Sequence, residues 1–293
     1  MEFVMRTNGL KKQYRKFTAL NGLTMNVPKG SIYGFVGRNG AGKTTLIRII
    51  TGLQIQNEGD FELYGAKSGT TDIYKARGRM GAIVETPSIH LDCTAEGNMR
   101  SMYRIMGLPI DGRISEILEL VGLGDTGSKK AKNFSLGMRQ RLGIAMALCS
   151  NPDFLILDEP INGLDPQGII EIRELILKLN KERNITVLIS SHILDELSKL
   201  ATHYGFIDKG RILLTGYKDE ILESHGILRC AKDYVQNVVP EDIVSIRTNN
   251  FGAEIMVSDR ESAKMKYRDT VIDPASLDDI MLYYVHRDAK EWS

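Results

Sequence analysis

The stretch "GRNGAGKTT", from Gly37 to Thr45, decides the fold class of this 293-residue chain. It follows the pattern G-x-x-x-x-G-K-[ST], and Lys43 and Thr44 close the motif. The apolar run "YGFVG" (33–37) before it predicts a buried strand, and "TTLIRIITGL" (44–53) after it predicts a helix. A strand, a glycine-rich turn and a helix in this order make a loop that binds phosphate groups.

The chemistry of this loop indicates a nucleoside triphosphate with Mg²⁺. Glycines let backbone N–H groups turn toward phosphate oxygens, and the helix N-terminus adds its positive end. Lys43 supplies a point charge to the outer phosphates, and the Thr44 hydroxyl can ligate Mg²⁺. The alternative is a plain strand–helix turn with a chance lysine, and the sequence on both flanks disfavours it. The predicted nucleotide-binding residues of the loop are Gly37, Arg38, Asn39, Gly40, Ala41, Gly42, Lys43, Thr44 and Thr45.

A second apolar run, "FLILDEP" (154–160), predicts a buried strand that ends in two carboxylates. Asp158 suits the Mg²⁺ partner of a phosphate loop. Glu159 is suited to polarise water as a general base beside the γ-phosphate. The alternative is a strand end with two solvated acids, and the adjoining "INGLDP" (161–166) disfavours it.

The remaining pattern predicts an α/β core followed by a smaller unit. "TVLIS" (186–190) is a third buried strand, and residues 135–150 and 165–184 have the periodicity of helices. We expect an ATPase-type domain over residues 1–220, including a helical insert at about 87–149, and an α+β appendage over 221–293. In the insert, no strong strand is expected between Pro87 and Phe134. In the appendage, the pattern predicts a hairpin over residues 243–258 and a short helix over residues 276–287.

Composition and charge limit which binding partners and which cell compartment suit this chain. The formal net charge is +1, which lacks the basic excess of a protein held on nucleic acid by its own field, so no nucleic acid is expected. The three cysteines are far apart, which favours a reducing compartment over a disulfide frame or a zinc site. The apolar stretches are shorter than the roughly 18 residues of a membrane span. We therefore expect a cytoplasmic chain, which another protein would have to anchor if it works at a membrane.

Three further stretches carry a family resemblance: "NFSLGMRQRL" (133–142), "INGLDP" and "ISSH" (189–192). Together with the phosphate loop and "FLILDEP", they resemble the ATPase subunits of ATP-binding cassette (ABC) transporters over about residues 1–220. The resemblance implies a P-loop NTPase of ABC type with a mixed sheet core, using ATP and Mg²⁺. It also implies that two copies of the chain enclose ATP between them.

The resemblance assigns further site residues. Ser135, Gly137 and Met138 correspond to the signature that closes over the ATP of a second copy, and Asp165 is the aspartate of the loop after Glu159. His192 corresponds to the switch histidine, and Tyr14 to the aromatic that stacks on adenine. From the residues alone, Ser135 is equally suited to an ordinary N-cap. An isolated histidine is more often structural, and Phe17 competes with Tyr14.

Three positions depart from the family pattern. Arg38 replaces a common proline, and Leu136 replaces the usual first glycine of the signature. Glu85, in "GAIVETPSI" (81–89), stands where most relatives have glutamine. Glutamate can ligate Mg²⁺ but donates no hydrogen bond when ionised, and the alternative is a solvated loop acid. Glu85, the signature and the terminal "SLDDIMLYY" (276–284) resemble the bacitracin-resistance and lantibiotic-immunity exporter branch.

The most consistent function is the motor of an exporter of antimicrobial peptides or drugs. A separately encoded integral membrane permease would hold the chain at the inner face of the cell membrane. One alternative is a soluble ABC ATPase acting on ribosomes or nucleic acid, but such proteins usually carry two linked cassettes or long coiled-coil inserts. The other is a regulator without turnover, which the presence of both Glu159 and His192 disfavours.

Overall fold

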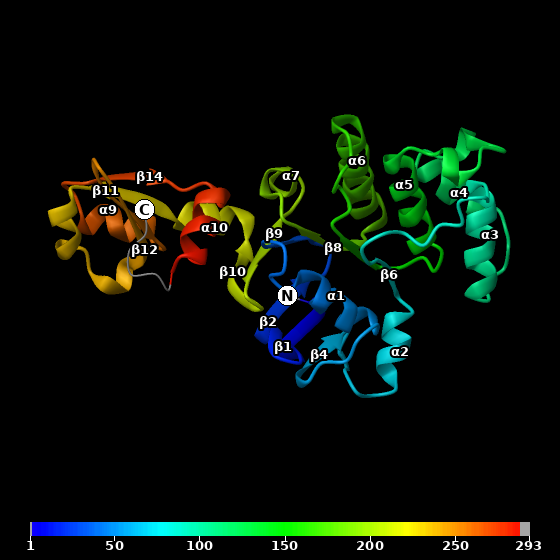
Figure 1. Ribbon diagram of the computed structural model, residues 1–293, viewed down its shortest axis with the longest axis horizontal. Coiled ribbons are helices and arrows are strands. Elements are labelled where there is room, and N and C mark those ends of the chain that lie inside the picture. The colour runs from blue at the N-terminus through cyan, green and yellow to red at the C-terminus, as the bar shows by residue number, and fades with distance from the viewer. Residues whose placement is uncertain (1, 288–293) are drawn as a thin grey trace.

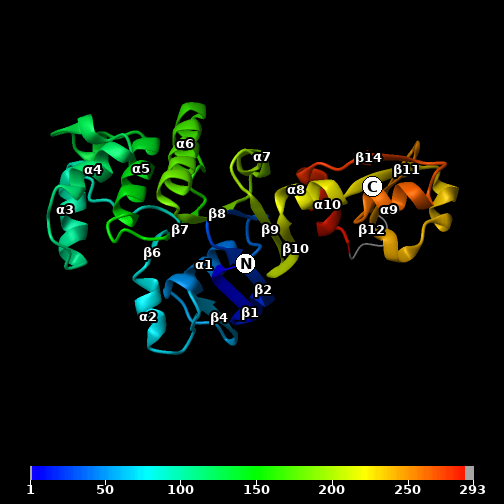
Figure 2. The same cartoon turned by 180° about the vertical axis from the view of Figure 1, so that it is seen from behind.

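In the computed structural model, which describes residues 2–287, the chain forms three parts in a row (Figure 1). A core built on sheets lies in the middle, an arm of helices lies at one end, and a small α+β unit lies at the other. The view from behind shows the same order (Figure 2). Among residues 2–287, no helix combines the length and apolarity needed to cross a membrane.

The core is organised by a six-stranded mixed sheet in the order β10-β9-β3-β8-β7-β6. Neighbouring strands from β9 to β6 run parallel, and β10 pairs antiparallel with β9. Every residue of β3, β7 and β8 is buried, which confirms the three strands expected from continuous apolar runs. The strands are β3 (Ile32–Val36), β6 (Met80–Ile83), β7 (Phe154–Asp158), β8 (Thr186–Ser191), β9 (His203–Asp208) and β10 (Arg211–Tyr217).

Helices α1 (Lys43–Thr51), α6 (Pro166–Arg183) and α7 (Leu194–Ser198) follow β3, β7 and β8 along the chain. Asp165 caps α6, because its carboxylate accepts a hydrogen bond from the Gly168 N–H group at 3.2 Å. The helices expected after the phosphate loop and over residues 165–184 are thus confirmed.

A second, antiparallel sheet in the order β2-β1-β4-β5 packs on the other side of α1. Leu46, Ile47 and Ile50 of α1 fill the space between the two sheets. This sheet was not expected from the sequence, because its long strands mix polar and apolar residues and contain several register shifts. Its strands are β1 (Phe3–Tyr14), β2 (Phe17–Pro28), β4 (Glu58–Leu63) and β5 (Ala66–Lys67), and α2 (Asp72–Arg77) follows them.

The helical arm contains α3 (Ala95–Ile105), α4 (Arg113–Leu120) and α5 (Leu136–Ala147), with short 3₁₀ turns between α4 and α5. Between residues 87 and 134 it holds one isolated bridge, from Thr94 to Lys130, and no strand. This confirms the helical character expected there. Ser135 caps α5, because its hydroxyl accepts a hydrogen bond from the Met138 N–H group at 3.2 Å.

We call residues 226–287 the C-terminal module. Its antiparallel sheet has the order β12-β13-β11-β14, and the hairpin expected over 243–258 is confirmed as β12 and β13. Helix α9 covers one face of the sheet and α10 the other. Helix α8 connects the module to β10 and contains residue 220, where the domain boundary was expected. The elements are α8 (Lys218–Ser224), β11 (Gly226–Cys230), β12 (Ile243–Asn249), β13 (Gly252–Val257), α9 (Arg260–Lys266), β14 (Val271–Pro274) and α10 (Leu277–Val285).

Candidate functional site

The carboxyl ends of β3, β7 and β8 meet at one edge of the core sheet, and there three motifs that are distant in sequence come together. Lys43 Nζ lies 3.1 Å from Glu159 Oε1. His192 Nδ1 lies 2.8 Å from Glu159 Oε2, and the ring N–H donates because a carboxylate only accepts. The Glu159 carboxylate therefore bridges the phosphate loop and the segment after β8.

The phosphate loop is shaped by glycines that no larger residue could replace without strain. Gly42 has φ 115°, and a Cβ atom there would lie 2.6 Å from the carbonyl oxygen of Ala19. The Lys43 ammonium, 5% exposed, donates to the Gly37 carbonyl oxygen at 2.6 Å. The lysine thus holds the two ends of the loop together while its charge faces Glu159.

Asp158 has the environment of a cation ligand. It is 1% exposed, and its Oδ1 atom accepts a hydrogen bond from the Ser190 hydroxyl at 2.5 Å. Its Oδ2 atom is buried and has no hydrogen-bond partner among the described residues. A buried carboxylate oxygen without a donor is costly, and a divalent cation relieves that cost. Asp158 therefore fits a Mg²⁺ ion, and Thr44 is the second residue of α1, which packs against β7.

The backbone of Glu159 is held in an uncommon conformation. Its φ is 51°, in the left-handed region that a glutamate rarely adopts, at a cost of about 1–3 kcal/mol. Its N–H group donates to the backbone oxygen of Ser190 at 3.2 Å and to the Ser190 hydroxyl at 3.0 Å. The same hydroxyl donates to Asp158, so Ser190 fixes both acidic residues. Ser190 was not among the expected site residues, although its place in "ISSH" at the end of a buried strand is a usable signal.

The His192 segment is also tied to the phosphate loop through the backbone. The Gly37 N–H group donates to the Ser191 carbonyl oxygen at 3.2 Å. The Ser191 hydroxyl accepts a hydrogen bond from the Ile193 N–H group at 2.9 Å, which shapes the turn that carries His192. Movement of this turn therefore affects both Glu159 and the loop.

Glu85 lies in a loop between β6 and the arm, with φ 62°. Its carboxylate forms an ion pair with Arg48 of α1, Nη2 to Oε1 2.5 Å, and its side chain is 58% exposed. Arg48 was not among the expected site residues, because it carries no signal apart from its helical position. The proposed role of Glu85 as a Mg²⁺ ligand stays a prediction.

Two aromatic rings stand at the turn between β1 and β2. Tyr14 and Phe17 are directly paired, and both are exposed. The Tyr14 hydroxyl donates to the Gln54 side-chain oxygen, and Lys12 Nζ lies 5.3 Å from the centre of the ring. Both residues stay candidates for stacking on adenine.

The signature residues lie in a different part of the molecule from the phosphate loop, because α5 belongs to the arm and α1 to the core (Figures 1 and 2). A Cβ atom on Gly137 would lie 3.6 Å from the Cα atom of Gly168, so the first turns of α5 and α6 are adjacent. Ser135 and Asp165 cap these two helices. Leu136 is 52% exposed beside them. Ser135 at the start of α5 and Lys43 at the start of α1 thus lie in different parts of the described structure, which agrees with a signature that serves a second copy.

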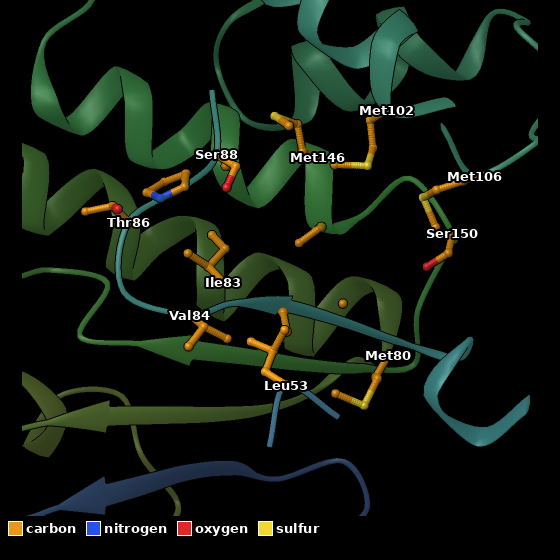
Figure 3. A pocket seen from close by; sticks show the side chains of 15 residues that line it. Leu53, Met80, Ile83, Val84, Thr86, Ser88, Met102, Met106, Met146 and Ser150 are labelled. Atoms are coloured by element: carbon orange, nitrogen blue, oxygen red, sulfur yellow. The ribbon is translucent and has the colours of Figure 1, made fainter. Parts of the chain in front are cut away.

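A cavity of about 370 Å³ lies between the arm and the core, next to the loop that holds Glu85. Figure 3 shows Met102 and Met146 together on one side of this cavity and Met80, Ile83 and Val84 on another. We call it the methionine groove. Its lining is Leu53, Met80, Gly81, Ala82, Ile83, Val84, Thr86, Pro87, Ser88, Met102, Met106, Gly143, Met146, Ala147 and Ser150.

Comparison with known proteins places this geometry in one family. The family described as "ABC transporter" matches residues 20–162. The bacitracin transport ATP-binding protein BcrA of Bacillus licheniformis is 46% identical over 215 residues, which cover 73% of this chain and 69% of the relative. The lantibiotic transport ATP-binding protein SrtF of Streptococcus pyogenes is 43% identical over 72% of this chain and 90% of the relative.

Solved structures agree with this assignment. The cassette cbiO1 of Clostridium perfringens, part of the ABC transporter complex cbiONQ, has TM-score 0.67 and 26% identity over 75% of this chain and 91% of its own. The ATP-binding cassette MJ1267 in its ADP conformation has TM-score 0.67 and 28% identity over 75% of this chain and 92% of its own. The chain therefore belongs to the ATP-binding proteins of ABC transporters, with the α/β P-loop fold expected from its sequence.

Proposed function

We propose that this chain is the ATP-hydrolysing subunit of an ABC exporter and that Glu159 is its general base. The observation that carries the proposal is the Glu159 carboxylate, which lies between Lys43 Nζ at 3.1 Å and His192 Nδ1 at 2.8 Å. These are the groups needed to bind a γ-phosphate and to activate water beside it.

Binding of ATP changes the partners of these groups. The phosphates take their places at the N–H groups of the loop and at Lys43, which then neutralises phosphate rather than Glu159. Glu159 is released to accept a proton from water, and His192 keeps it oriented through the bond to Oε2. Thr44 and Asp158 would hold Mg²⁺, and the ion would neutralise negative charge on the β- and γ-phosphates.

A second copy completes the site in this proposal. Ser135 and the backbone at the start of α5 offer donors suited to an anion, and Asp165 stands beside them at the start of α6. In a two-fold dimer, each copy presents this end to the phosphate loop of the other.

The methionine groove suits a short apolar segment of the permease. Met side chains adapt to different partners, and the groove adjoins the loop in which Glu85 contacts Arg48 of α1. A segment seated there would therefore reach the helix that begins at Lys43. We infer that the permease holds the chain at the cytoplasmic face of the membrane. The names of the relatives favour peptide antibiotics such as bacitracin or lantibiotics as cargo.

The test is a Glu159→Gln variant of the full chain. It keeps the shape of the side chain but removes the base, so ATP binding should persist, hydrolysis should fall by at least about a hundredfold, and a dimer should accumulate with ATP. Lys43→Ala is the matched control, because it should weaken ATP binding itself. Unchanged turnover in Glu159→Gln would remove Glu159 from its role.

A second experiment tests the exporter assignment. A tagged Glu159→Gln chain is recovered from native membranes with ATP present. In a parallel recovery, a Met102→Lys variant places a charge in the methionine groove. A multi-span membrane protein should accompany the first and be lost from the second. Recovery of ribosomes instead would overturn the exporter function.

A further inference from the structure

Helix α10 of the C-terminal module packs directly on the core. It contacts α7 and β10, and Figures 1 and 2 show it on the side of the module that faces β10. Leu277 and Ile280 of α10 belong to the same buried apolar cluster as Leu194 and Leu197 of α7. The apolar interior is therefore continuous from the module into the core.

Helix α7 is the element that immediately follows His192. It starts at Leu194, and its last carbonyl groups are held from two sides. The Tyr204 hydroxyl donates to the Leu197 oxygen at 2.9 Å, and Lys218 Nζ donates to the Ser198 oxygen at 2.6 Å. Lys218 is the first residue of α8, which leads into the module. The placement of α7 thus depends on both the core and the connection to the module.

Helix α10 is fixed to the rest of the module by side-chain hydrogen bonds. The Ser245 hydroxyl of β12 donates to the Tyr283 carbonyl oxygen at 2.9 Å. The Tyr284 hydroxyl also lies 2.9 Å from Nε2 of the buried His225, which ends α8 just before the module. The first turn of α10 is itself held by a capping box formed by Ser276 and Asp279. A shift of the module therefore carries α10 with it.

The far end of α10 borders the phosphate loop. A cleft of about 790 Å³ separates Tyr284 and Arg287 from the turn between β9 and β10, and Arg38 lies in its wall. Arg38 is the loop residue that replaces the usual proline. One helix thus touches the element after His192 at one end and faces the phosphate loop at the other.

Like charges meet where α10 approaches α7. Partial desolvation beside α7 raises the pKa of the otherwise exposed Asp278 in the first turn of α10, and the charges of Asp195 in α7 and of Asp279 add to the rise. Asp195 and Asp278 are both exposed. Their charges can therefore be changed without disturbing the apolar cluster beneath them.

We propose that the C-terminal module is a positioning element for hydrolysis: through α10 it sets the position of α7, and through α7 that of His192 against Glu159. The inference rests on the proposed function of those two residues. A catalytic group displaced by about 1 Å can cost up to a hundredfold in rate, so a small shift of α7 is sufficient. The module then controls the rate of hydrolysis and leaves ATP binding to the phosphate loop.

The test is a double-mutant cycle on the full chain with Asp195→Lys and Asp278→Lys. Each single reversal turns repulsion into attraction and draws α7 toward α10, so kcat should fall by at least about threefold, with the Kd for ATP within about twofold of the unaltered chain. The double variant restores like charges, and its kcat should return to within about twofold. Asp269→Lys, an exposed reversal in the turn before β14, is the matched control and should leave kcat unchanged.

The outcomes separate the two proposals. Three results would overturn the positioning role: equal kcat values in all variants, effects of the two reversals that simply multiply, or a change confined to ATP affinity. Thermal unfolding of each variant checks that kcat does not follow loss of folded protein. If the unaltered chain does not hydrolyse ATP at all, the proposed function fails first.

Discussion

Removal of the Ser190 hydroxyl should destabilise the nucleotide site strongly. This hydroxyl donates to Asp158 Oδ1 at 2.5 Å and accepts from the Glu159 N–H group at 3.0 Å, and Ser190 is fully buried. A hydrogen bond to a charged group contributes about 1.5–3 kcal/mol, and a neutral one about 1 kcal/mol. Ser190→Ala should therefore cost about 3 kcal/mol in free energy of unfolding, because Asp158 Oδ2 already has no partner among the described residues.

The assay is thermal unfolding without nucleotide. A loss of about 3 kcal/mol corresponds to a fall in Tm of roughly 6–12 °C. Ser101→Ala is the control, because the Ser101 hydroxyl donates to the Gly97 carbonyl oxygen of its own helix at 3.0 Å. Adding Asp158→Asn to Ser190→Ala should recover part of the loss, because no buried charge is left without a donor. A Tm within about 1 °C of the unaltered chain would refute the reasoning, since a fall that small corresponds to less than about 0.5 kcal/mol.

Three further predictions concern single residues. Gly42→Ala should abolish ATP binding, because φ is 115° and the added Cβ atom would lie 2.6 Å from the Ala19 oxygen; tight binding of a labelled ATP analogue by the variant would contradict this. Glu85→Gln should shift the Mg²⁺ dependence of hydrolysis but change stability by less than about 0.5 kcal/mol, because its ion pair with Arg48 is largely exposed; superimposable Mg²⁺ titrations would rule out the ligand role. Burial lowers the pKa of His225, so the folded state favours the neutral imidazole. The free energy of unfolding should therefore be highest above about pH 6.5 and should fall as the pH drops below that value. His225→Asn should flatten that dependence in unfolding experiments, whereas an unchanged slope would assign it to other groups.

Local patterns predicted the strands that form this edge of the core sheet. Strands β3, β7 and β8 are buried on both faces, so their apolar runs were visible without knowledge of their neighbours. The cap at Ser135 was also expected, because an N-cap hydrogen bond joins residues only three positions apart. The cap at Asp165 was seen only in the structure. The antiparallel sheet was not predicted, because its strands alternate buried and exposed residues irregularly and pair across long separations.

The sequence by itself determined the class of this protein, because phosphate binding needs a particular order of strand, glycines, lysine and helix within a few residues. Only the tertiary structure decided that Ser190 serves both Asp158 and Glu159, that Arg48 pairs with Glu85, and that α10 lies against α7. These contacts join residues far apart in the chain. Their geometry follows from how the strands of the sheet align and how the apolar faces of the module and core pack, which no short stretch of sequence encodes.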